Sequence, residues 1–118
     1  MDPEELDLTG LKRISERDVR RGAMRYLAQV DIDPAALDER WGGPEAVRDD
    51  LAEWVCFAFC PVEGEAFMLH REAHHPPAPG FVLSVTGGLF SADAAARILE
   101  VLGIAGARVT QVNAEATK

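Results

Sequence analysis

The spacing of hydrophobic residues in the first half of the chain predicts helices. Val19, Ala23, Leu27 and Val30 follow the i, i+4, i+8, i+11 spacing of a buried helical stripe. With Ser15 as the N-cap, this stripe predicts a first helix over residues 16–30. A short helical turn follows, opened by Asp33-Pro34 and closed by Gly42. A further helix is predicted from Gly43-Pro44, with Val47, Leu51 and Trp54 as its inward-facing residues.

The second half of the chain changes to an extended pattern. Residues 54–62 contain no charge and are rich in aromatic and branched side chains, which is typical of a central strand. A hairpin turn at Glu63-Gly64 leads into a second strand over 66–70, and residues 81–85 form a third. Ser91 caps a helix that runs to Leu102 and ends at Gly103. Residues 108–112 are predicted as a last strand, at an edge of the sheet.

This order, α-α-β-β-β-α-β, predicts one α+β domain over residues 1–118, with flexible ends at about 1–8 and 114–118. The hairpin requires antiparallel pairing, and the β-α-β tail requires a right-handed crossover. The expected architecture is a two-layer sandwich, with helices packed on a mixed four-stranded sheet. A ferredoxin-like arrangement is the alternative, and it would need an early strand near Leu6–Leu11.

The hairpin also predicts which side chains share a face of the sheet. With the turn at Glu63-Gly64, the residue numbers of two cross-strand partners add up to 127. Cys56, Ala58 and Cys60 then share one face with Phe67 and Leu69. Phe57 and Phe59 share the other face with Met68, and we expect this phenylalanine face to be the core because aromatic side chains bury the most area. Otherwise it would be an interface with a second copy of the chain.

Composition and charge limit the possible environments and partners. Hydrophobic residues make up 47% of the chain, which is enough for an ordinary core. The first residues show no signal-peptide pattern, and the longest uncharged apolar run, 54–62, is too short to cross a bilayer. We therefore expect a cytoplasmic protein with no membrane partner. The net charge of −8 argues against nucleic-acid binding, which uses Lys and Arg to meet phosphates.

Two groups of residues suggest metal chemistry at first sight. Cys56 and Cys60 lie on the same face of the predicted strand, but four residues of strand separate them by about 13 Å. That distance is too long for a disulfide or for a shared ion. His70, His74 and His75 lie within six residues, yet a closed zinc site needs four ligands. We expect neither a metal nor another cofactor.

No pattern for nucleophilic catalysis is present, since the sequence contains no G-x-S-x-G elbow. Thr86–Ser91 joins a strand to a helix through Gly87-Gly88 and could offer main-chain N–H groups to an anion. It matches neither of the established glycine-rich phosphate motifs, and Asp93 in the following turn would repel an anion. Catalytic residues are therefore not assigned, and a non-enzymatic role is expected.

The strongest functional indication is an asymmetry of charge. Residues 11–25 carry six basic side chains, whereas residues 31–53 carry eight acidic ones. The four arginines of the predicted first helix are expected to be solvated or paired with the acidic segment. An acidic surface with an aromatic anchor is the composition that binds a basic protein surface. The predicted partner-binding residues are Glu39, Trp41, Glu45, Asp49, Asp50 and Glu53.

The sequence thus favours a non-catalytic protein-binding function. Bacterial immunity proteins and antitoxins, which block a basic active site by charge complementarity, share this general character without any shared motif. One alternative is a small enzyme or metal-dependent domain that uses His70, His74 or His75. Another is a homo-oligomeric accessory domain, such as a homodimer.

Overall fold

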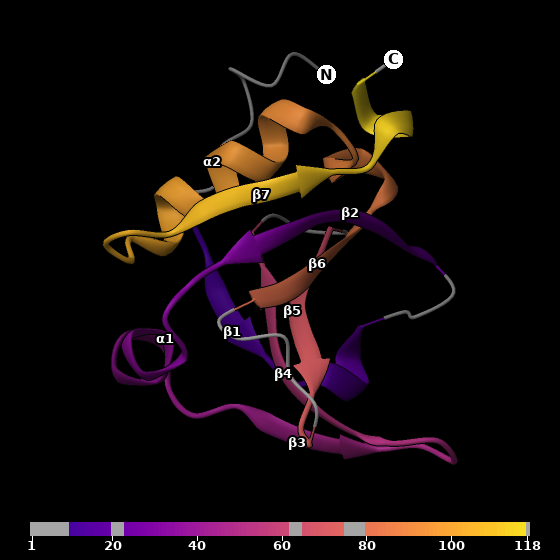
Figure 1. Ribbon diagram of the computed structural model, residues 1–118, viewed down its shortest axis with the longest axis vertical. Helices are drawn as coiled ribbons and strands as arrows, with labels where there is room; N and C mark the ends of the chain where they lie inside the picture. The colour runs from indigo at the N-terminus through magenta and orange to yellow at the C-terminus, as the bar shows by residue number, and fades with distance from the viewer. Residues whose placement is uncertain (1–9, 20–22, 62–64, 75–79, 118) are drawn as a thin grey trace.

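The computed structural model describes residues 10–19, 23–61, 65–74 and 80–117. These residues form an α+β fold with a seven-stranded antiparallel sheet and two α-helices (Figure 1). The strands are β1 (Lys12–Ile14), β2 (Met24–Asp31), β3 (Glu45–Arg48), β4 (Glu53–Cys60), β5 (Phe67–Glu72), β6 (Gly80–Thr86) and β7 (Arg108–Val112). The helices are α1 (Pro34–Trp41) and α2 (Ala92–Leu102).

The strands pair in the order β1-β4-β5-β6-β2-β7, and β3 also pairs with β4. The outer edge of β4 is shared, because β3 pairs with its first half and β1 with its second. The mixed four-stranded sheet predicted above is therefore wrong. The ferredoxin-like alternative is wrong as well, because it too has four strands. Most of the early strand that it would need near Leu6–Leu11 lies outside the described residues.

The predicted first helix is strand β2, preceded by a single 3₁₀ turn at Glu16–Asp18. Ser15 does act as an N-cap, but only for that turn. The register of β2 against β6 shifts between Tyr26 and Ala28, which marks a β-bulge. The bulge interrupts the alternation of inward and outward side chains. Leu27 and Val30 are consequently both buried at a spacing of three, which imitates a helical stripe.

The predicted helix from Gly43-Pro44 is also wrong, because this segment forms the β3–β4 hairpin. Val47 and Trp54, expected on one face of a helix, are instead cross-strand partners. Leu51, expected to point inward, lies in the turn between the strands and is 93% exposed. The hairpin projects at the lower right of Figure 1.

The other predicted elements are confirmed. Asp33 caps α1 by accepting a hydrogen bond from the Ala35 N–H at 3.0 Å. Ser91 caps α2 in the same way through the Ala94 N–H, also at 3.0 Å. The helix ends at Gly103, whose φ of 71° lies in the left-handed region that glycine adopts without strain. Strand β7 is the edge strand beyond β2.

Both helices cover the same face of the sheet. Leu37 of α1 and Ile98 of α2 join the phenylalanine side chains of that face in the main core. Phe57 and Phe59 are 1% and 0% exposed, so the phenylalanine face is the covered core face, as predicted. The opposite face, which we call the open face, carries a smaller cluster around Cys56, Ala58 and Met68.

The predicted register of β4 and β5 is wrong by one residue. Phe57 pairs with Leu69, and Ala58 pairs with Met68, so paired positions sum to 126. Because side chains alternate along a strand, this single step exchanges the partners on the two faces. Phe67 and Leu69 join the phenylalanines in the core, whereas Met68 and His70 join Cys56 on the open face. The predicted turn at Glu63-Gly64 lies outside the described residues.

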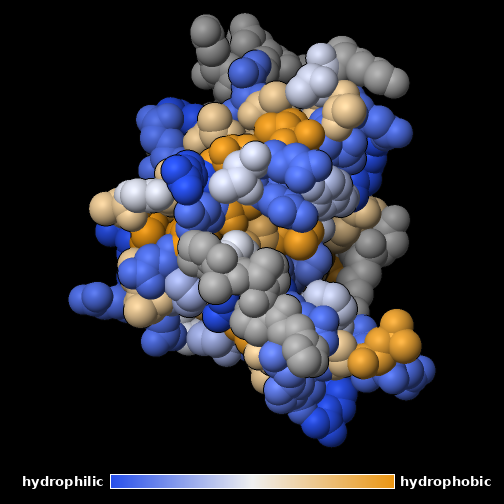
Figure 2. All heavy atoms as spheres, viewed as in Figure 1, coloured by the Kyte–Doolittle hydropathy of each residue, from blue (hydrophilic) through white to orange (hydrophobic). Residues whose placement is uncertain are grey.

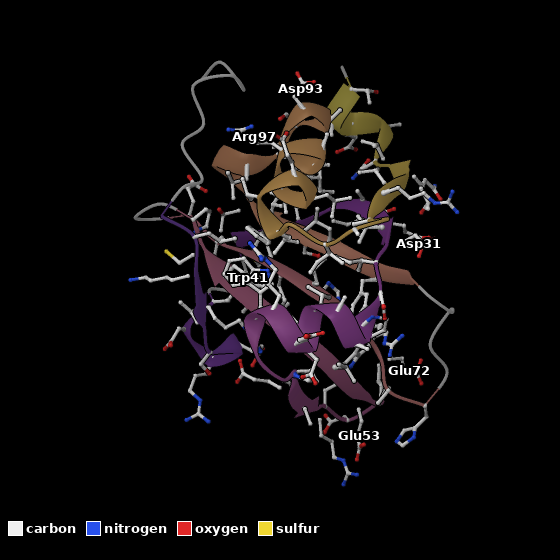
Figure 3. The ribbon with its side chains drawn as sticks, turned by 90° about the vertical axis from the view of Figure 1, so that its left-hand side faces the viewer. Asp31, Trp41, Glu53, Glu72, Asp93 and Arg97 are labelled. Carbon is white, nitrogen blue, oxygen red and sulfur yellow. The ribbon has the colours of Figure 1, made fainter. Side chains whose placement is uncertain are left out.

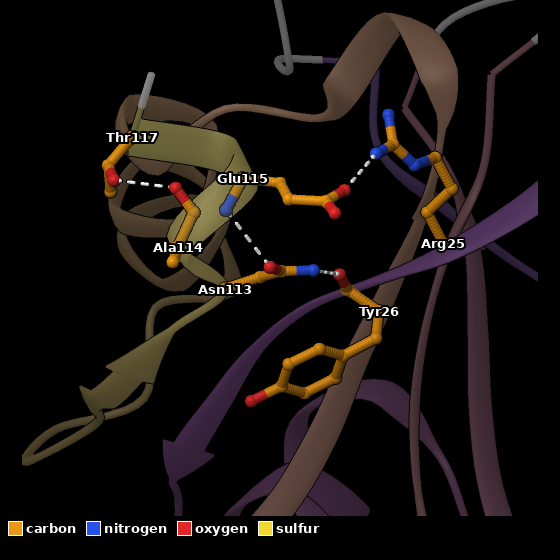
Figure 4. A network of polar contacts seen from close by, with 6 residues as sticks. All are labelled: Arg25, Tyr26, Asn113, Ala114, Glu115 and Thr117. Atoms are coloured by element: carbon orange, nitrogen blue, oxygen red, sulfur yellow. Dashed lines mark hydrogen bonds and ion pairs between the residues drawn. The ribbon is translucent and has the colours of Figure 1, made fainter.

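Residues 114–117 lie against β2 (Figure 4). Ala114–Thr117 forms a 3₁₀ turn. Asn113 joins this turn to the strand, since its Nδ2 donates to the Tyr26 carbonyl at 2.9 Å and its Oδ1 accepts from the Glu115 N–H at 3.1 Å. An ion pair of 3.0 Å between Arg25 and Glu115 adds a second connection.

Candidate protein-binding hairpin and open-face pocket

The turn of the β3–β4 hairpin is built around one carboxylate. Asp49 Oδ1 accepts hydrogen bonds from the main-chain N–H groups of Leu51 and Ala52, both at 2.8 Å. Its Oδ2 accepts from the indole Nε1 of Trp54 at 2.9 Å. Asp residues favour turns because the side chain can bond the main chain two or three residues ahead. These three contacts fix the shape of the turn.

Two exposed residues occupy the end of this turn. The Leu51 side chain is 93% exposed, and Asp50 beside it is exposed as well. At the lower right of Figure 2, where Figure 1 places the hairpin, an apolar group stands out among hydrophilic ones. The hairpin therefore presents a leucine in an acidic setting on a turn of fixed shape.

Glu45, another predicted partner-binding residue, has a structural role. Its Oε1 accepts from the main-chain N–H of Glu16 at 2.7 Å, and its Oε2 accepts from the Ser15 hydroxyl at 3.0 Å. The carboxylate thus satisfies N–H and O–H donors where the chain enters the 3₁₀ turn at Glu16–Asp18. It connects β3 to the segment that follows β1.

Trp41 is directed into the protein rather than toward solvent (Figure 3). Its ring meets that of Phe59 edge to face, with centroids 5.5 Å apart, and its Nε1 donates to the Leu102 carbonyl at 2.9 Å. Figure 3 shows Glu53 well apart from it, at the far end of β4. Glu39 is exposed on α1. Within the predicted set, the hairpin brings together Asp49, Asp50 and Glu53.

Glu53 lies between two nitrogen-bearing side chains, those of Arg48 and His74. It pairs with Arg48 across the hairpin, and its Oε2 lies 3.2 Å from Nε2 of His74. The hydrogen bond and the positive charge of Arg48 lower the pKa of the Glu53 carboxyl below its ordinary value, and His74 adds a smaller effect in the same direction. The carboxylate form is therefore the one that the hairpin favours.

The described histidines are not brought together. His70 lies on β5, where its Nε2 is 3.0 Å from Ser84 Oγ, whereas His74 lies beyond the strand at Glu53. His75 is outside the described residues. Among the residues that the structure describes, no three His, Cys, Asp or Glu side chains are placed to share a metal ion. Cys56 and Cys60 form no disulfide.

A pocket of about 280 Å³ lies on the open face. Its polar groups include the imidazole of His70, which is also in edge-to-face contact with the Trp54 ring, with centroids 6.1 Å apart. The sequence did not reveal this pocket, because four strands and a turn contribute to it. It is lined by Met24, Asp49, Trp54, Cys56, Met68, His70 and Ser84.

The Gly87-Gly88 turn already faces an anionic group of the protein. A Cβ atom built on Gly88 would overlap the carboxylate of Glu65. The Thr86 hydroxyl donates a hydrogen bond to the same carboxylate and accepts one from the Ala66 N–H at 3.1 Å. A phosphate at this turn would meet the negative charge of Glu65.

Two basic residues of the N-terminal segment, Arg13 and Arg25, make contacts within the fold, whereas Arg17 is exposed. Arg13 donates hydrogen bonds to the carbonyl oxygens of Trp41, Gly42 and Gly43 at 2.7–3.2 Å. Burial lowers the pKa of its guanidinium, and the charges of Glu45 and Asp38 oppose that change. Arg25 pairs with Glu115, as described above, and Arg20 and Arg21 lie outside the described residues.

Comparisons with known proteins identify no relative. No protein-family model, curated protein or solved structure matches this chain. Among the described residues, no helix is long and apolar enough to cross a bilayer.

Proposed function

We propose that this protein is a non-catalytic binding protein that recognises another protein through the tip of its β3–β4 hairpin. The observation that carries this proposal is the exposure of Leu51, 93%, on a turn held by the hydrogen bonds of Asp49. Burying a leucine side chain against a partner contributes about 1.5–3 kcal/mol. A turn of fixed shape loses little conformational entropy when it binds.

The charge around the tip indicates the kind of partner. Asp49 and Asp50 precede Leu51, and the whole chain carries a net charge of −8. Acidic groups around an apolar contact favour a partner with an apolar pocket bordered by Lys and Arg, and they accelerate its approach. An inhibitor of the immunity-protein or antitoxin type, which covers a basic active site, is the class that we propose.

The structure also determines which acidic residues can be tested. Reversing the charge of Glu45 or Asp49 would break hydrogen bonds that hold the 3₁₀ turn and the hairpin. Asp50 is exposed and can be changed to Lys without such a loss. Leu51→Ala removes the apolar side chain and likewise leaves the hydrogen bonds of the turn in place.

The experiment places a photoreactive amino acid at position 51 and, as a matched control, at the exposed position of Glu100 on α2. Irradiation in the native lysate should give a defined adduct from position 51 and not from position 100. For the partner identified in that adduct, Leu51→Ala should weaken binding by about tenfold. Asp50→Lys should slow association and reduce its dependence on salt. Equal adducts from both positions, or unchanged binding by Leu51→Ala, would refute the proposal.

A further inference from the structure

The floor of the open-face pocket is formed by two cross-strand pairs. Cys56 of β4 pairs with His70 of β5, and both line the pocket. Met68 of β5 pairs with Ser84 of β6, and both line it as well. The contact of 3.0 Å between His70 Nε2 and Ser84 Oγ joins the two polar side chains to each other. The buried Cys56 and Met68 therefore give the floor an apolar character, which suits the apolar part of a ligand.

Trp54 and Met24 lie at opposite ends of this pocket. Trp54 lies two residues before Cys56 on β4, whereas Met24 lies on β2 opposite Thr86, two positions beyond Ser84. The pocket consequently extends across the neighbouring strands β4, β5, β6 and β2. Its volume of about 280 Å³ is close to the lower end of the range that ligand pockets occupy, about 300–1,000 Å³. This size and shape suit a small, elongated molecule.

The Trp54 end of the pocket is negatively charged. Glu72 is the cross-strand partner of Trp54 and therefore shares its face of the sheet. The Asp49 carboxylate lies at the edge of the indole, where its Oδ2 accepts from Nε1 at 2.9 Å. The positive charge of Arg48, in the same hairpin, is paired with Glu53. A cation is attracted to the face of an indole ring, and at Trp54 it would also lie beside these two carboxylates.

We propose that the open-face pocket binds a small organic cation, an amine or a quaternary ammonium ion with an apolar body. The charged group lies over the indole of Trp54, beside Asp49 and Glu72, and the apolar body lies along Met68 toward Met24. An anion would be repelled by the two carboxylates, and a neutral molecule of the same shape would lack the attraction of the indole and of both charges. This site is additional to the protein-binding contact proposed for Leu51.

The test is an NMR titration of the full, untagged chain with phenylethylammonium as the probe. We expect a saturable shift of the indole N–H signal of Trp54 and of the methyl signals of Met24 and Met68. The indole signal of Trp41, whose donor is bonded to the Leu102 carbonyl, should stay unchanged. The neutral 2-phenylethanol should bind about tenfold more weakly than the cation, and the anion phenylacetate should not saturate the site.

Variants separate the pocket from the general negative charge of the chain. Glu72→Gln should lower the affinity for phenylethylammonium several-fold and leave that for 2-phenylethanol unchanged. Glu100→Gln, at an exposed position of α2, changes the net charge equally and is the matched control, which should bind like the wild type. Followed through the Met68 methyl signal, Trp54→Leu should weaken binding of the cation more than Trp54→Phe, since a phenyl ring retains part of the attraction.

Leu51→Ala should bind phenylethylammonium like the wild type, so a failure of the pocket and a failure of the hairpin contact give different results. Equal affinities for phenylethylammonium and 2-phenylethanol would overturn the proposal. Equal effects of Glu72→Gln and Glu100→Gln would also overturn it, because they would assign the binding to the net charge of the chain rather than to the pocket.

Discussion

The indole Nε1 of Trp41, the last residue of α1, donates a hydrogen bond to the main-chain carbonyl of Leu102, the last residue of α2, at 2.9 Å. The two helices cover the same face of the sheet, and this bond links their ends directly. The ring of Trp41 also meets Phe59 of the core at 5.5 Å. Trp41 therefore joins three elements that are distant in the sequence.

Trp41→Phe should test that connection. The variant keeps an aromatic ring near Phe59 but leaves the Leu102 carbonyl without its indole donor. We expect the free energy of unfolding to fall by about 1–2 kcal/mol, measured by urea denaturation at constant slope. Trp54→Phe is the control. It also removes an indole hydrogen bond, but the acceptor is the exposed carboxylate of Asp49, where water can replace the lost donor. An equal loss in the two variants would contradict the role given to Trp41.

Phe59→Ala should test the assignment of the core face. Phe59 is 0% exposed and stacks on Phe67 with ring centroids 5.0 Å apart. Removing a buried phenylalanine costs about 3–5 kcal/mol. Leu51→Ala, on the exposed turn, should stay within about 0.5 kcal/mol of the wild type. If Phe59→Ala kept its stability but converted an oligomer into a monomer in sedimentation, that face would be an interface.

Elements with local signals were predicted from the sequence, because caps and turn residues act within a few positions. Asp33-Pro34 begins α1, and Ser91 and Gly103 mark the ends of α2. Strand β2 was missed because its bulge places Leu27 and Val30 on the same side, which reproduces helical spacing. The β3–β4 hairpin was missed because its turn depends on the side chain of Asp49 rather than on glycine.

The same difference explains which parts of the candidate sites could be predicted: contacts between sequence neighbours could be, and contacts between strands could not. The acidic residues around Leu51 are neighbours in the sequence, so their proximity could be predicted even though the helix was wrong. The open-face pocket depends on pairing between strands. A register error of one residue placed Met68 on the face opposite Cys56, and the contact between Cys56 and His70 could not be seen before that register was known.

Gly88→Ala should test the contact between the Gly87-Gly88 turn and Glu65. A Cβ atom at this position would displace the Glu65 carboxylate and with it the hydrogen bond from Thr86. Since the carboxylate is the end of a flexible side chain, the expected loss is about 1 kcal/mol, the value of one such bond. In a Glu65→Ala background the same change should cost less, by a double-mutant cycle of urea denaturation. Equal costs in both backgrounds would show that Glu65 is not the group displaced.

The ionisation of Glu53 should respond more strongly to the loss of Arg48 than to the loss of His74. The hydrogen bond and charge of Arg48 are the main cause of the lowered pKa of this carboxyl, and His74 contributes less. Because the folded-state pKa of Glu53 lies below the ordinary 4.5, the pair of Arg48 and Glu53 stabilises the hairpin above that pH. This contribution is lost as the pH falls through the folded-state pKa.

Arg48→Met should therefore raise the pKa of Glu53 toward 4.5, measured by carbon-detected NMR titration, and His74→Gln should raise it by a smaller amount. Arg97→Met, on α2, is the control and should leave the titration of Glu53 unchanged. A larger shift in His74→Gln than in Arg48→Met would assign the lowered pKa to the histidine and not to the cross-strand pair.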